Sequence, residues 1–443
     1  MDTNSKIGKK LFDLQGHKTD VRTEVIAGAT MFLTMVYVLF LQPFAIIGPT
    51  PVFVDIMGVE VTSTAIFILT ALITGVSTIV MGLYANFPFA LSTAMGINFL
   101  LGGMLQAGQI SFAAMMTVTF ISGLIFILLT VFGLRKYVVE LIPKDIKVAI
   151  GAAIGFFLAY LGFSNSGLAN FSNGIHMGDF SSPTVILTLI GLLLIIFFEH
   201  KKIKGGILFS VIIVTLLGIP FGITNTVISF SAPDFSSVSN LVFKFSFTEI
   251  MKPMFITVLF ATFFGDFFST LGTVLGLGGR LNLLDEDGNF PGIDKPFLVD
   301  SCFTAIGALF GCTVITTFVE SAAGVESGGR TGLTSVVSGI LFIVAILLAP
   351  FVSIIPAAAT APILIYIGYL MISDIVKIDF SSMETAFGPF ITLVFTIFFG
   401  DFSAGIAGGI IAEVIIRIIY GKGKDTKMGL YILAALLLLY FVV

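Results

Sequence analysis

The chain has 443 residues, of which 57% are hydrophobic and 11% are charged, and its net charge is −4. Soluble globular proteins carry about 25% charged residues, so this depletion excludes a soluble globular fold and predicts a polytopic membrane protein. The negative net charge predicts no nucleic-acid partner. The alternating pattern of a membrane β-barrel is absent. We therefore expect an all-α fold, because helices are the other structure that satisfies every backbone group in lipid.

A polar, charged arm, residues 1–23, precedes the apolar part of the chain and does not resemble a cleavable signal. About fourteen apolar runs follow in two sets. The first set comprises residues 25–47, 64–84, 89–105, 113–132, 146–163, 184–198 and 206–223. The second set comprises residues 253–277, 297–310, 313–325, 334–355, 361–372, 386–399 and 403–419. Several runs are too short to cross a ~30 Å core as one straight helix, and a last apolar segment, 428–443, fits either an interfacial helix or a short span.

Lysine and arginine mark one side of the membrane. They occur in the N-terminal arm and in every second loop after it, whereas the opposite loops carry only Lys244 and Lys252. By the positive-inside rule, this pattern predicts a multi-pass plasma-membrane protein with a cytoplasmic N-terminus. The longest outside loop, residues 224–252, separates the two sets of runs. Because each set holds an odd number of runs, the second set must be inverted relative to the first.

Two short runs at matching positions of the two sets contain small residues that interrupt them. They read ALSTAMGINFLLGG and GCTVITTFVESAAG, and each begins with an extended, Thr-bearing stretch before a polar residue, Asn98 or Glu320. Inverted-repeat transporters hold their substrate near the midplane at such interrupted helices. The N-terminus of a half-helix carries partial positive charge and free N–H groups, which suit a polar or anionic ligand. We therefore expect a secondary transporter whose site lies between these segments.

Asp266, in the stretch FFGDFFSTLG of the eighth run, and Glu320 are acids inside apolar runs. A charge at the bilayer centre costs about 2.5–3.5 kcal/mol on insertion scales, so such residues usually face a cavity. The alternatives are a hydrogen-bonded core acid for Asp266 and a helix–helix contact for Asn98. Glu413 and Arg417 are four residues apart on one run, a spacing that predicts a structural ion pair. No cluster or motif indicates a metal or a cofactor.

Several motifs together resemble a known family. They read GATMFLTMVYVLFLQP, AMGIN, IPKDIKVAIGAAIGFFLAYLG, FFSTLGTVLGL and VESAAGVESGGRTGLTSVV. They resemble the AzgA-like purine permeases of the nucleobase–cation symporter 2 (nucleobase–ascorbate transporter) superfamily, over roughly residues 20–375. The resemblance implies a uracil-permease-like fold of about fourteen helices in two inverted repeats. It assigns residues 24–133 and 253–355 to a core domain and residues 146–223 and 359–420 to a gate domain, followed by a C-terminal tail, 421–443.

The resemblance also assigns site residues. Asp266 matches the acid on helix eight that holds the base, and Glu320 matches the carboxylate on helix ten that accepts hydrogen bonds from ring N–H groups. Phe318, with its neighbour Val319, matches an aromatic or adjacent backbone position that lines the pocket. Asn98 matches the polar residue of the motif on helix three. Asp266 and Glu320 are also the expected proton-coupling residues.

Other residues near the expected site are singled out by their surroundings or by departure from the family pattern. Phe267 lies beside Asp266 and is a stacking candidate for the base. Ser269, included in the expected binding site, stands where many relatives have a second acid. Gln42 replaces a common Asn before a proline, and the pair Thr93 and Ala94 replaces a common Pro-Gly. These departures leave the substrate and the coupling open.

The family resemblance thus predicts a permease that imports purine nucleobases (guanine, hypoxanthine or adenine) by proton symport with alternating access. Which purine is preferred, whether Na⁺ replaces the proton, and whether the chain forms a homodimer are left open. One alternative is an anion or other small-solute transporter of the same fold, which would carry a basic residue or none at the position of Glu320. A membrane-embedded enzyme is the other, and it lacks a nucleophile, metal or cofactor motif.

Overall fold

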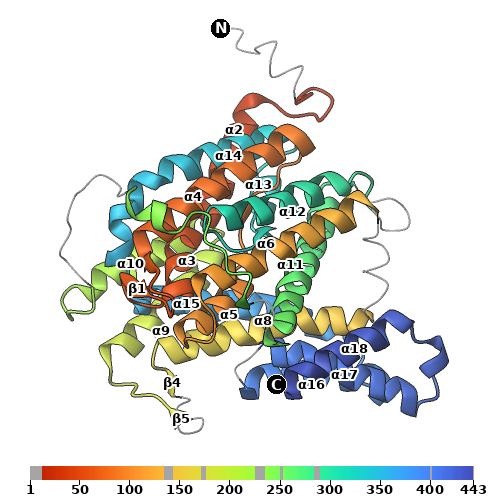
Figure 1. Ribbon diagram of the computed structural model, residues 1–443. Coiled ribbons are helices and arrows are strands. Elements are labelled where there is room, and N and C mark those ends of the chain that lie inside the picture. The colour runs from red at the N-terminus through yellow and green to blue at the C-terminus, as the bar shows by residue number, and fades with distance from the viewer. Residues whose placement is uncertain are drawn as a thin grey trace.

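The computed structural model describes residues 12–133, 143–170, 176–224, 235–249, 253–283, 290–399 and 402–442. Figure 1 shows a bundle of packed helices. Eight helices in the described residues are long and apolar enough to cross a membrane. The prediction of an all-α membrane fold is confirmed.

Each expected apolar run corresponds to a helix or to a broken helix. The first set contains α2 (Val21–Met35), α3 (Tyr37–Ile47), α4 (Ser63–Val80) with the π-helical turn Met81–Ala85, α5 (Met95–Gln106), α6 (Phe112–Val131), α8 (Lys144–Asn165), α9 (Pro183–His200) and α10 (Gly206–Gly218). The second set contains α11 (Pro253–Arg280), α12 (Asp294–Leu309), α13 (Ser321–Glu326), α14 (Gly332–Val344) with the 3-10 segment Ala345–Ile354, α15 (Ala357–Ile372), α16 (Met383–Phe399) and α17 (Phe402–Ile419), and α18 (Met428–Val442) follows. Helix α2 begins inside the predicted arm, because the side chain of Asp20 caps it by accepting from the N–H of Thr23 at 3.0 Å.

The two expected extended stretches are the strands β3 (Leu91–Thr93) and β6 (Ile315–Thr317). They pair antiparallel, with Leu91 opposite Thr317 and Thr93 opposite Ile315. Each strand leads into a half-helix, β3 into α5 and β6 into α13. The prediction of extended stretches before the half-helices is therefore confirmed. Two further short hairpins, β1 (Val52–Val54) with β2 (Glu60–Thr62) and β4 (Ala169–Asn170) with β5 (His176–Met177), lie in loops.

A threonine closes the outer edge of each central strand. The Thr78 hydroxyl on α4 donates to the Leu91 carbonyl at 3.2 Å and accepts from the Leu91 N–H at 3.1 Å. The Thr304 hydroxyl on α12 does the same for Ile315, at 2.8 and 3.2 Å. A hydroxyl can donate and accept at once, so one side chain satisfies both backbone groups of an edge residue. The two repeats therefore satisfy the edge backbone groups of their strands with equivalent threonines.

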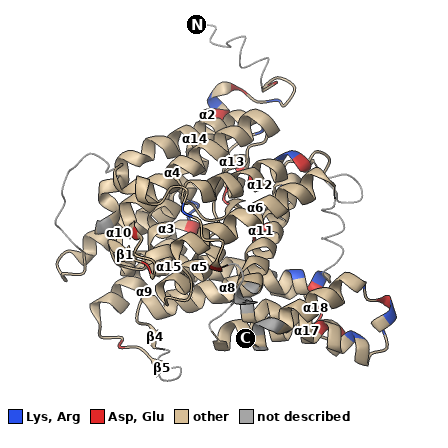
Figure 2. Ribbon diagram, in the orientation of Figure 1, with Lys and Arg blue, Asp and Glu red and all other residues tan. Residues whose placement is uncertain are grey.

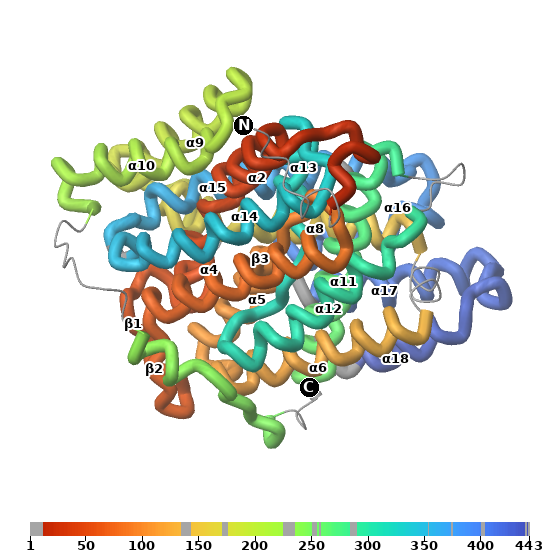
Figure 3. Tube along the Cα trace, turned by 90° about the horizontal axis from the view of Figure 1, so that it is seen from above, coloured from red at the N-terminus to blue at the C-terminus, as the bar shows by residue number. Residues whose placement is uncertain are grey.

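Helix packing repeats the same inverted symmetry. Helix α4 packs against α14, and α12 packs against α6, so helices at matching places of the two repeats face partners of the other repeat. This packing agrees with the expected fold of two inverted sets of helices. Helices α8, α15, α16 and α17 pack together, as do α9, α10 and α15. The terminal helix α18 lies against α17 and α11 (Figure 3).

Charged side chains lie mainly in loops and at helix ends, and most of the helical surface carries none (Figure 2). Among the charged residues inside the bundle, Glu413 accepts from the Arg417 guanidinium at 2.7 Å on the same helix. The predicted structural pair is therefore confirmed.

Glycines allow a close crossing between the helices α8 and α15. A Cβ atom added at Gly155 would lie 2.7 Å from the Gly368 carbonyl oxygen and 2.9 Å from the Ile372 nitrogen. We expect Gly155→Ala to push the two helices apart, because overpacking typically costs roughly 1–3 kcal/mol. The measurement is the thermal unfolding temperature of the purified protein in detergent, which should fall.

Gly151 supplies the matched control on the same helix. A Cβ atom there would meet nothing within 4 Å, so Gly151→Ala should leave the unfolding temperature unchanged or raise it slightly through helix propensity. Equal unfolding temperatures for both variants would show that the crossing of α8 and α15 tolerates an added methyl group.

Candidate functional site

Glu320 caps the short helix α13, directly after β6. Its Oε1 atom accepts a hydrogen bond from the Tyr37 hydroxyl at 2.7 Å. Tyr37 is buried at the start of α3, directly after the break between α2 and α3. Phe318 is buried, whereas the side chain of Val319 is 58% exposed, and Glu320 is partly exposed. The junction between β6 and α13 therefore presents a carboxylate, oriented by a tyrosine, to an open space.

Tyr37 was not among the predicted site residues. Its only sequence signal was its place in the motif GATMFLTMVYVLFLQP, because a tyrosine in an apolar run is ordinarily a core or interfacial residue. The contact joins residues 283 positions apart in sequence. Only the fold reveals it.

Asn98 lies on α5, and its side chain is fully buried. Its amide donates to the Gln42 side-chain oxygen at 2.6 Å, and the Gln42 amide in turn donates to the Thr313 hydroxyl at 3.0 Å. Gln42, noted as a departure from the family pattern, thus bridges α3, α5 and the segment before β6. The carbonyl oxygen of Asn98 has no hydrogen-bond donor among the described residues. Thr93 lies in β3 beside Ala94, whose N–H donates to the Val314 carbonyl at 2.9 Å.

Asp266 lies on α11 with its side chain fully buried, and it faces α12. Its Oδ2 atom accepts from the Thr304 hydroxyl at 3.3 Å. A second buried acid, Asp300 of α12, interacts electrostatically with it. The Asp300 Oδ2 atom accepts from the Thr270 hydroxyl at 2.8 Å and from the Thr317 N–H at 2.8 Å. The structure therefore pairs Asp266 with an acid that the sequence analysis missed.

A repeated spacing could have indicated Asp300. The stretches DFFST and DSCFT both place a threonine four residues after an aspartate, as Asp266 with Thr270 and Asp300 with Thr304. On a helix, residues four apart share a face. Each threonine binds the acid of the other helix.

Two other predicted residues, Phe267 and Ser269, have contacts other than Glu320. The Phe267 ring is fully buried against the rings of Phe126 and Phe297, whose centroids are 5.2 and 5.8 Å away. It thus packs against α6 and α12. Ser269 is partly exposed on α11, next to Phe268, whose ring centroid lies 5.9 Å from the Lys147 ammonium.

Helices α9 and α15 face Glu320 from the other side. Glu199, near the end of α9, accepts a hydrogen bond from the Tyr366 hydroxyl of α15. Both side chains lie close enough to Glu320 to interact with it electrostatically. The Glu320 carboxylate therefore lies near polar side chains of α9 and α15.

A buried acid, Glu24, fixes the link that follows α13. Glu24 of α2 accepts from the Arg330 N–H at 2.9 Å, and from the Thr334 N–H and hydroxyl at 3.2 and 2.6 Å, at the start of α14. The Arg330 guanidinium donates to the carbonyls of Val325 and Gly329 at 2.7 and 2.8 Å, at the end of α13. The sequence GGRTGLT thereby fixes both ends of the link between α13 and α14.

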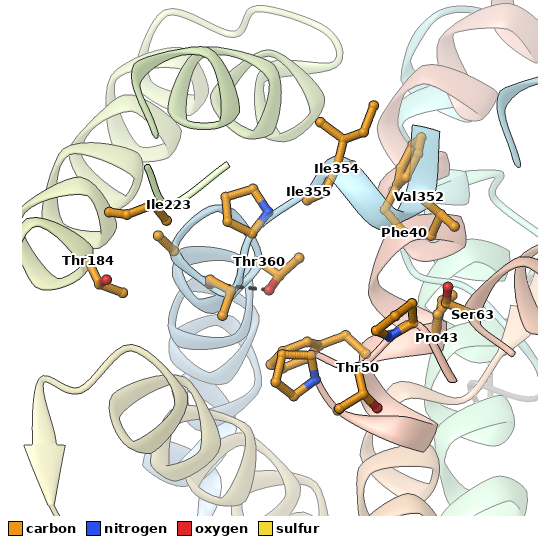
Figure 4. Close-up of a pocket in the computed structure, with 17 residues that line it drawn as sticks. Phe40, Pro43, Thr50, Ser63, Thr184, Ile223, Val352, Ile354, Ile355 and Thr360 are labelled. Carbon is orange, nitrogen blue, oxygen red and sulfur yellow. Dashed lines mark hydrogen bonds between the residues drawn. The ribbon is translucent and has the colours of Figure 1, made fainter. Parts of the chain in front are cut away.

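The contacts of α9 and α10 with α2 and α3 differ between the two ends of the bundle. At one end, the Lys204 ammonium, in the loop between α9 and α10, donates to the Ser327 hydroxyl at 2.7 Å and to the Thr30 hydroxyl at 3.4 Å. At the other end lies a cavity of about 400 Å³ (Figure 4). Phe40, Thr184 and Thr360 are among its lining residues, from α3, α9 and α15. The helices are thus tied at one end and separated by a cavity at the other.

Comparisons with known proteins show the family to which the chain belongs. The family model described as the permease family matches residues 22–407. The chain is 34% identical to the adenine permease AdeP of Escherichia coli strain K12, over 98% of this chain and 96% of the relative. It is 31% identical to the guanine/hypoxanthine permease PbuG of Bacillus subtilis strain 168, over 98% of this chain and 99% of the relative.

A solved structure with a similar fold is the transmembrane domain of the cyanobacterial bicarbonate transporter BicA. It is 18% identical, with a TM-score of 0.62, over 86% of this chain and 97% of that domain. Identity at this level establishes the fold alone. The family match covers most of the chain, and the curated relatives match it from end to end. The chain therefore belongs to the permease family, and the resemblance of its motifs to AzgA-like purine permeases is confirmed.

Proposed function

We propose that this chain imports purine nucleobases across the plasma membrane by proton symport, with its N-terminus in the cytoplasm. The observation that carries the proposal is the Glu320 carboxylate, oriented by Tyr37 at the end of a mid-membrane strand and open to the space beside Val319. Relatives named as adenine and guanine/hypoxanthine permeases supply the substrate class.

The chemistry of a purine fits this junction. A purine is flat and carries ring N–H donors, which a carboxylate accepts well. Tyr37 holds one oxygen of Glu320, so the other is directed to the ligand. Phe318 and Val319 flank the carboxylate and cover the face of the base. Asn98 completes the set from α5, through a carbonyl oxygen that has no donor among the described residues.

Transport then follows by alternating access between two helix groups. Residues 24–133 and 253–355 form the core domain that carries Glu320, and residues 146–223 and 359–420 form the gate domain that carries Glu199 and Tyr366. The Lys204 contact ties the groups at the end that we place in the cytoplasm, and the cavity lies between them at the opposite end. This arrangement corresponds to a permease that is closed inside and opening outside. An anion transporter of the same fold is disfavoured, because Glu320 would repel the ligand.

The direct test is uptake by cells that lack their own nucleobase permeases. Cells that express the chain should accumulate radiolabelled hypoxanthine, guanine or adenine unchanged, more at acidic external pH, and unlabelled purines should compete. Conversion of the base would indicate an enzyme, and an absence of uptake for all three bases would refute the proposal.

Glu320→Gln tests the reading of the base. The amide oxygen of the variant can stay with Tyr37, which turns an NH₂ group toward the donors of the base. Loss of a charge-assisted hydrogen bond costs roughly 1.5–3 kcal/mol, so purine binding to the purified protein should weaken about ten- to a hundredfold. Calorimetry with several purines measures this, and bases with two adjacent N–H donors should lose most.

Glu326→Gln is the matched control. Glu326 lies on the same short helix, is exposed, and pairs with Arg280 of α11. Its substitution should leave binding unchanged. Unaltered affinity of the Glu320→Gln protein for every purine would show that Glu320 does not contact the base.

A cross-link between the two helix groups tests alternating access. Cys302 and Cys312 are first replaced by alanine, and Lys204→Cys and Ser327→Cys are then joined by a short bifunctional thiol reagent. Uptake should stop and should return on reduction, because the groups can no longer separate at that end. Binding of the base to the purified protein should persist.

The control cross-link joins the gate domain to the tail that follows it and leaves the two groups free of each other. Lys422, just after α17, and Glu384, at the start of α16, form an ion pair with a 2.5 Å separation. Joining cysteines at these two positions should leave uptake unaffected. If uptake continued at the untreated rate with residues 204 and 327 joined, relative movement of the two groups at that end would not be part of transport.

A further inference from the structure

We propose that Asp266 and Asp300 together form a buried proton-binding site, in which Asp300 is a second coupling residue and the pair binds one proton, carried by Asp266. The inference rests on the proposed function, because it gives the imported base its coupling ion. It differs from that function in assigning the proton to the contact between α11 and α12, behind the strand that carries the base site.

The two acids are linked by reciprocal contacts. Thr304, four residues after Asp300, donates to Asp266 at 3.3 Å. Thr270, four residues after Asp266, donates to Asp300 at 2.8 Å. Both carboxylates are fully buried, and the Oδ1 atom of each lacks a hydrogen-bond partner among the described residues. Two adjacent buried carboxylates, each with an unpartnered oxygen, favour binding of a cation, because a buried acceptor without a donor is costly and two adjacent negative charges are more so.

The partners of the two acids show where the proton resides. The Asp300 Oδ2 atom accepts three hydrogen bonds, from the Thr270 hydroxyl and from the N–H and hydroxyl of Thr317, at 2.8, 2.8 and 3.2 Å. Among the described residues, Asp266 has only the longer contact with the Thr304 hydroxyl, whose single proton is shared with the nearer Ile315 carbonyl at 2.8 Å. Several donors stabilise a carboxylate in its charged form. Asp300 is therefore the anion of the pair, and Asp266 takes the proton.

A proton fits this site better than Na⁺. A hard metal cation needs a shell of several oxygen ligands. The Thr304 hydroxyl is already engaged with both backbone groups of Ile315, and the Thr270 hydroxyl with Asp300 and Thr316. Among the described residues of this contact, the two Oδ1 atoms and the Thr262 hydroxyl, four residues before Asp266, are the side-chain oxygens without a partner, fewer than such a shell needs.

Other ionisable groups around the pair are few. Helices α5, α6 and α18 contribute no acid, lysine, arginine or histidine to α11, which they contact. Helix α17 contributes Glu413 and Arg417, which pair with each other. Helix α8 contributes Lys144, Asp145 and Lys147, of which Lys147 lies over the Phe268 ring. Helix α13 contributes Glu326, which pairs with Arg280 of α11, and Glu320 directly precedes that helix. Helix α12 itself begins with Asp294 and Lys295. The pH response of the pair is therefore set mainly by the two acids themselves.

The first repeat shows that an acid is not needed to hold the strand. Thr78 grips Leu91 in β3 as Thr304 grips Ile315 in β6. Four residues before Thr78 stands Thr74, which bonds the Ser92 hydroxyl at 2.9 Å. Four residues before Thr304 stands Asp300. A neutral hydroxyl therefore suffices beside the strand in the first repeat. The structure of the second repeat does not by itself require an acid at the equivalent position, Asp300.

The pair is placed to influence the base site. Asp300 holds the N–H of Thr317, three residues before Glu320. Protonation changes the charge that this backbone group sees, at the strand from which α13 begins. The proton and the base thereby bind to opposite sides of one short segment, which gives a direct physical route for coupling.

The test uses the full-length protein in liposomes and the variants Asp300→Asn and Asp300→Thr, the second copying the first repeat. Exchange of labelled for unlabelled hypoxanthine needs no net proton movement and should persist in both. Accumulation driven by an inward proton gradient, and the accompanying proton entry, should be lost. Thr317→Val removes a hydroxyl donor to Asp300 but keeps both acids, and it should retain proton-driven accumulation.

Infrared spectroscopy of the purified protein gives a readout that does not depend on transport. The wild type should show the C=O band of a protonated carboxylic acid that Asp266→Asn removes. Asp300→Asn should make that band disappear at a lower pH, because the neighbouring negative charge is gone. This result would support the site even if no purine were transported, so failure of the proposed function is distinguishable.

Three outcomes would overturn the inference. One is proton-driven accumulation by Asp300→Asn at the wild-type level. Another is a band whose pH dependence does not change in that variant. The third is accumulation by the wild type under a Na⁺ gradient but not under a proton gradient, with loss in the variants, which would make the site one for Na⁺.

Discussion

A helix broken in the middle of a membrane leaves backbone N–H and C=O groups without partners, and pairing of β3 with β6 satisfies them here. Neither strand can exist alone at that depth, because each supplies the hydrogen bonds of the other. Thr78 and Thr304 close the two outer edges. The position of Glu320 is therefore determined by a strand from the opposite repeat. An inverted repeat is in this sense a structural necessity, since one interrupted helix requires a second.

The strand pair also explains why so many hydroxyl side chains lie in the centre of an apolar bundle. Thr74, Ser92 and Thr316 are buried, as are the two edge threonines. Each forms hydrogen bonds with the strands or with residues that contact them. A threonine is small and β-branched, so it fits a helix that packs closely on a strand while it supplies both a donor and an acceptor. The same closeness is provided by glycine where two helices cross, as at Gly155 and Gly368.

Local patterns in the sequence predicted much of this arrangement, and the remainder depends on contacts across the fold. Interrupted runs, composition and loop charge predicted the helices and the two extended stretches. The presence of an acid inside an apolar run singled out Glu320. Asp300 and Tyr37 were missed because their meaning comes from partners far away in sequence, Asp266 and Glu320. Phe267 was singled out as a neighbour of Asp266, but adjacent residues on a helix point in different directions. Its ring accordingly packs against α6 and α12.

The acids of this protein fall into two groups according to their partners. Glu413 and Glu326 pair with arginines, which donate only and stay charged, so these contacts are ion pairs. Glu320 and Asp266 have hydroxyl partners instead, Tyr37 and Thr304. A hydroxyl can donate to a carboxylate and accept from a carboxylic acid, so the contact survives when the proton arrives or leaves. Such a partner lets an acid change charge inside the membrane without losing its place, which a coupling residue requires and a structural ion pair does not.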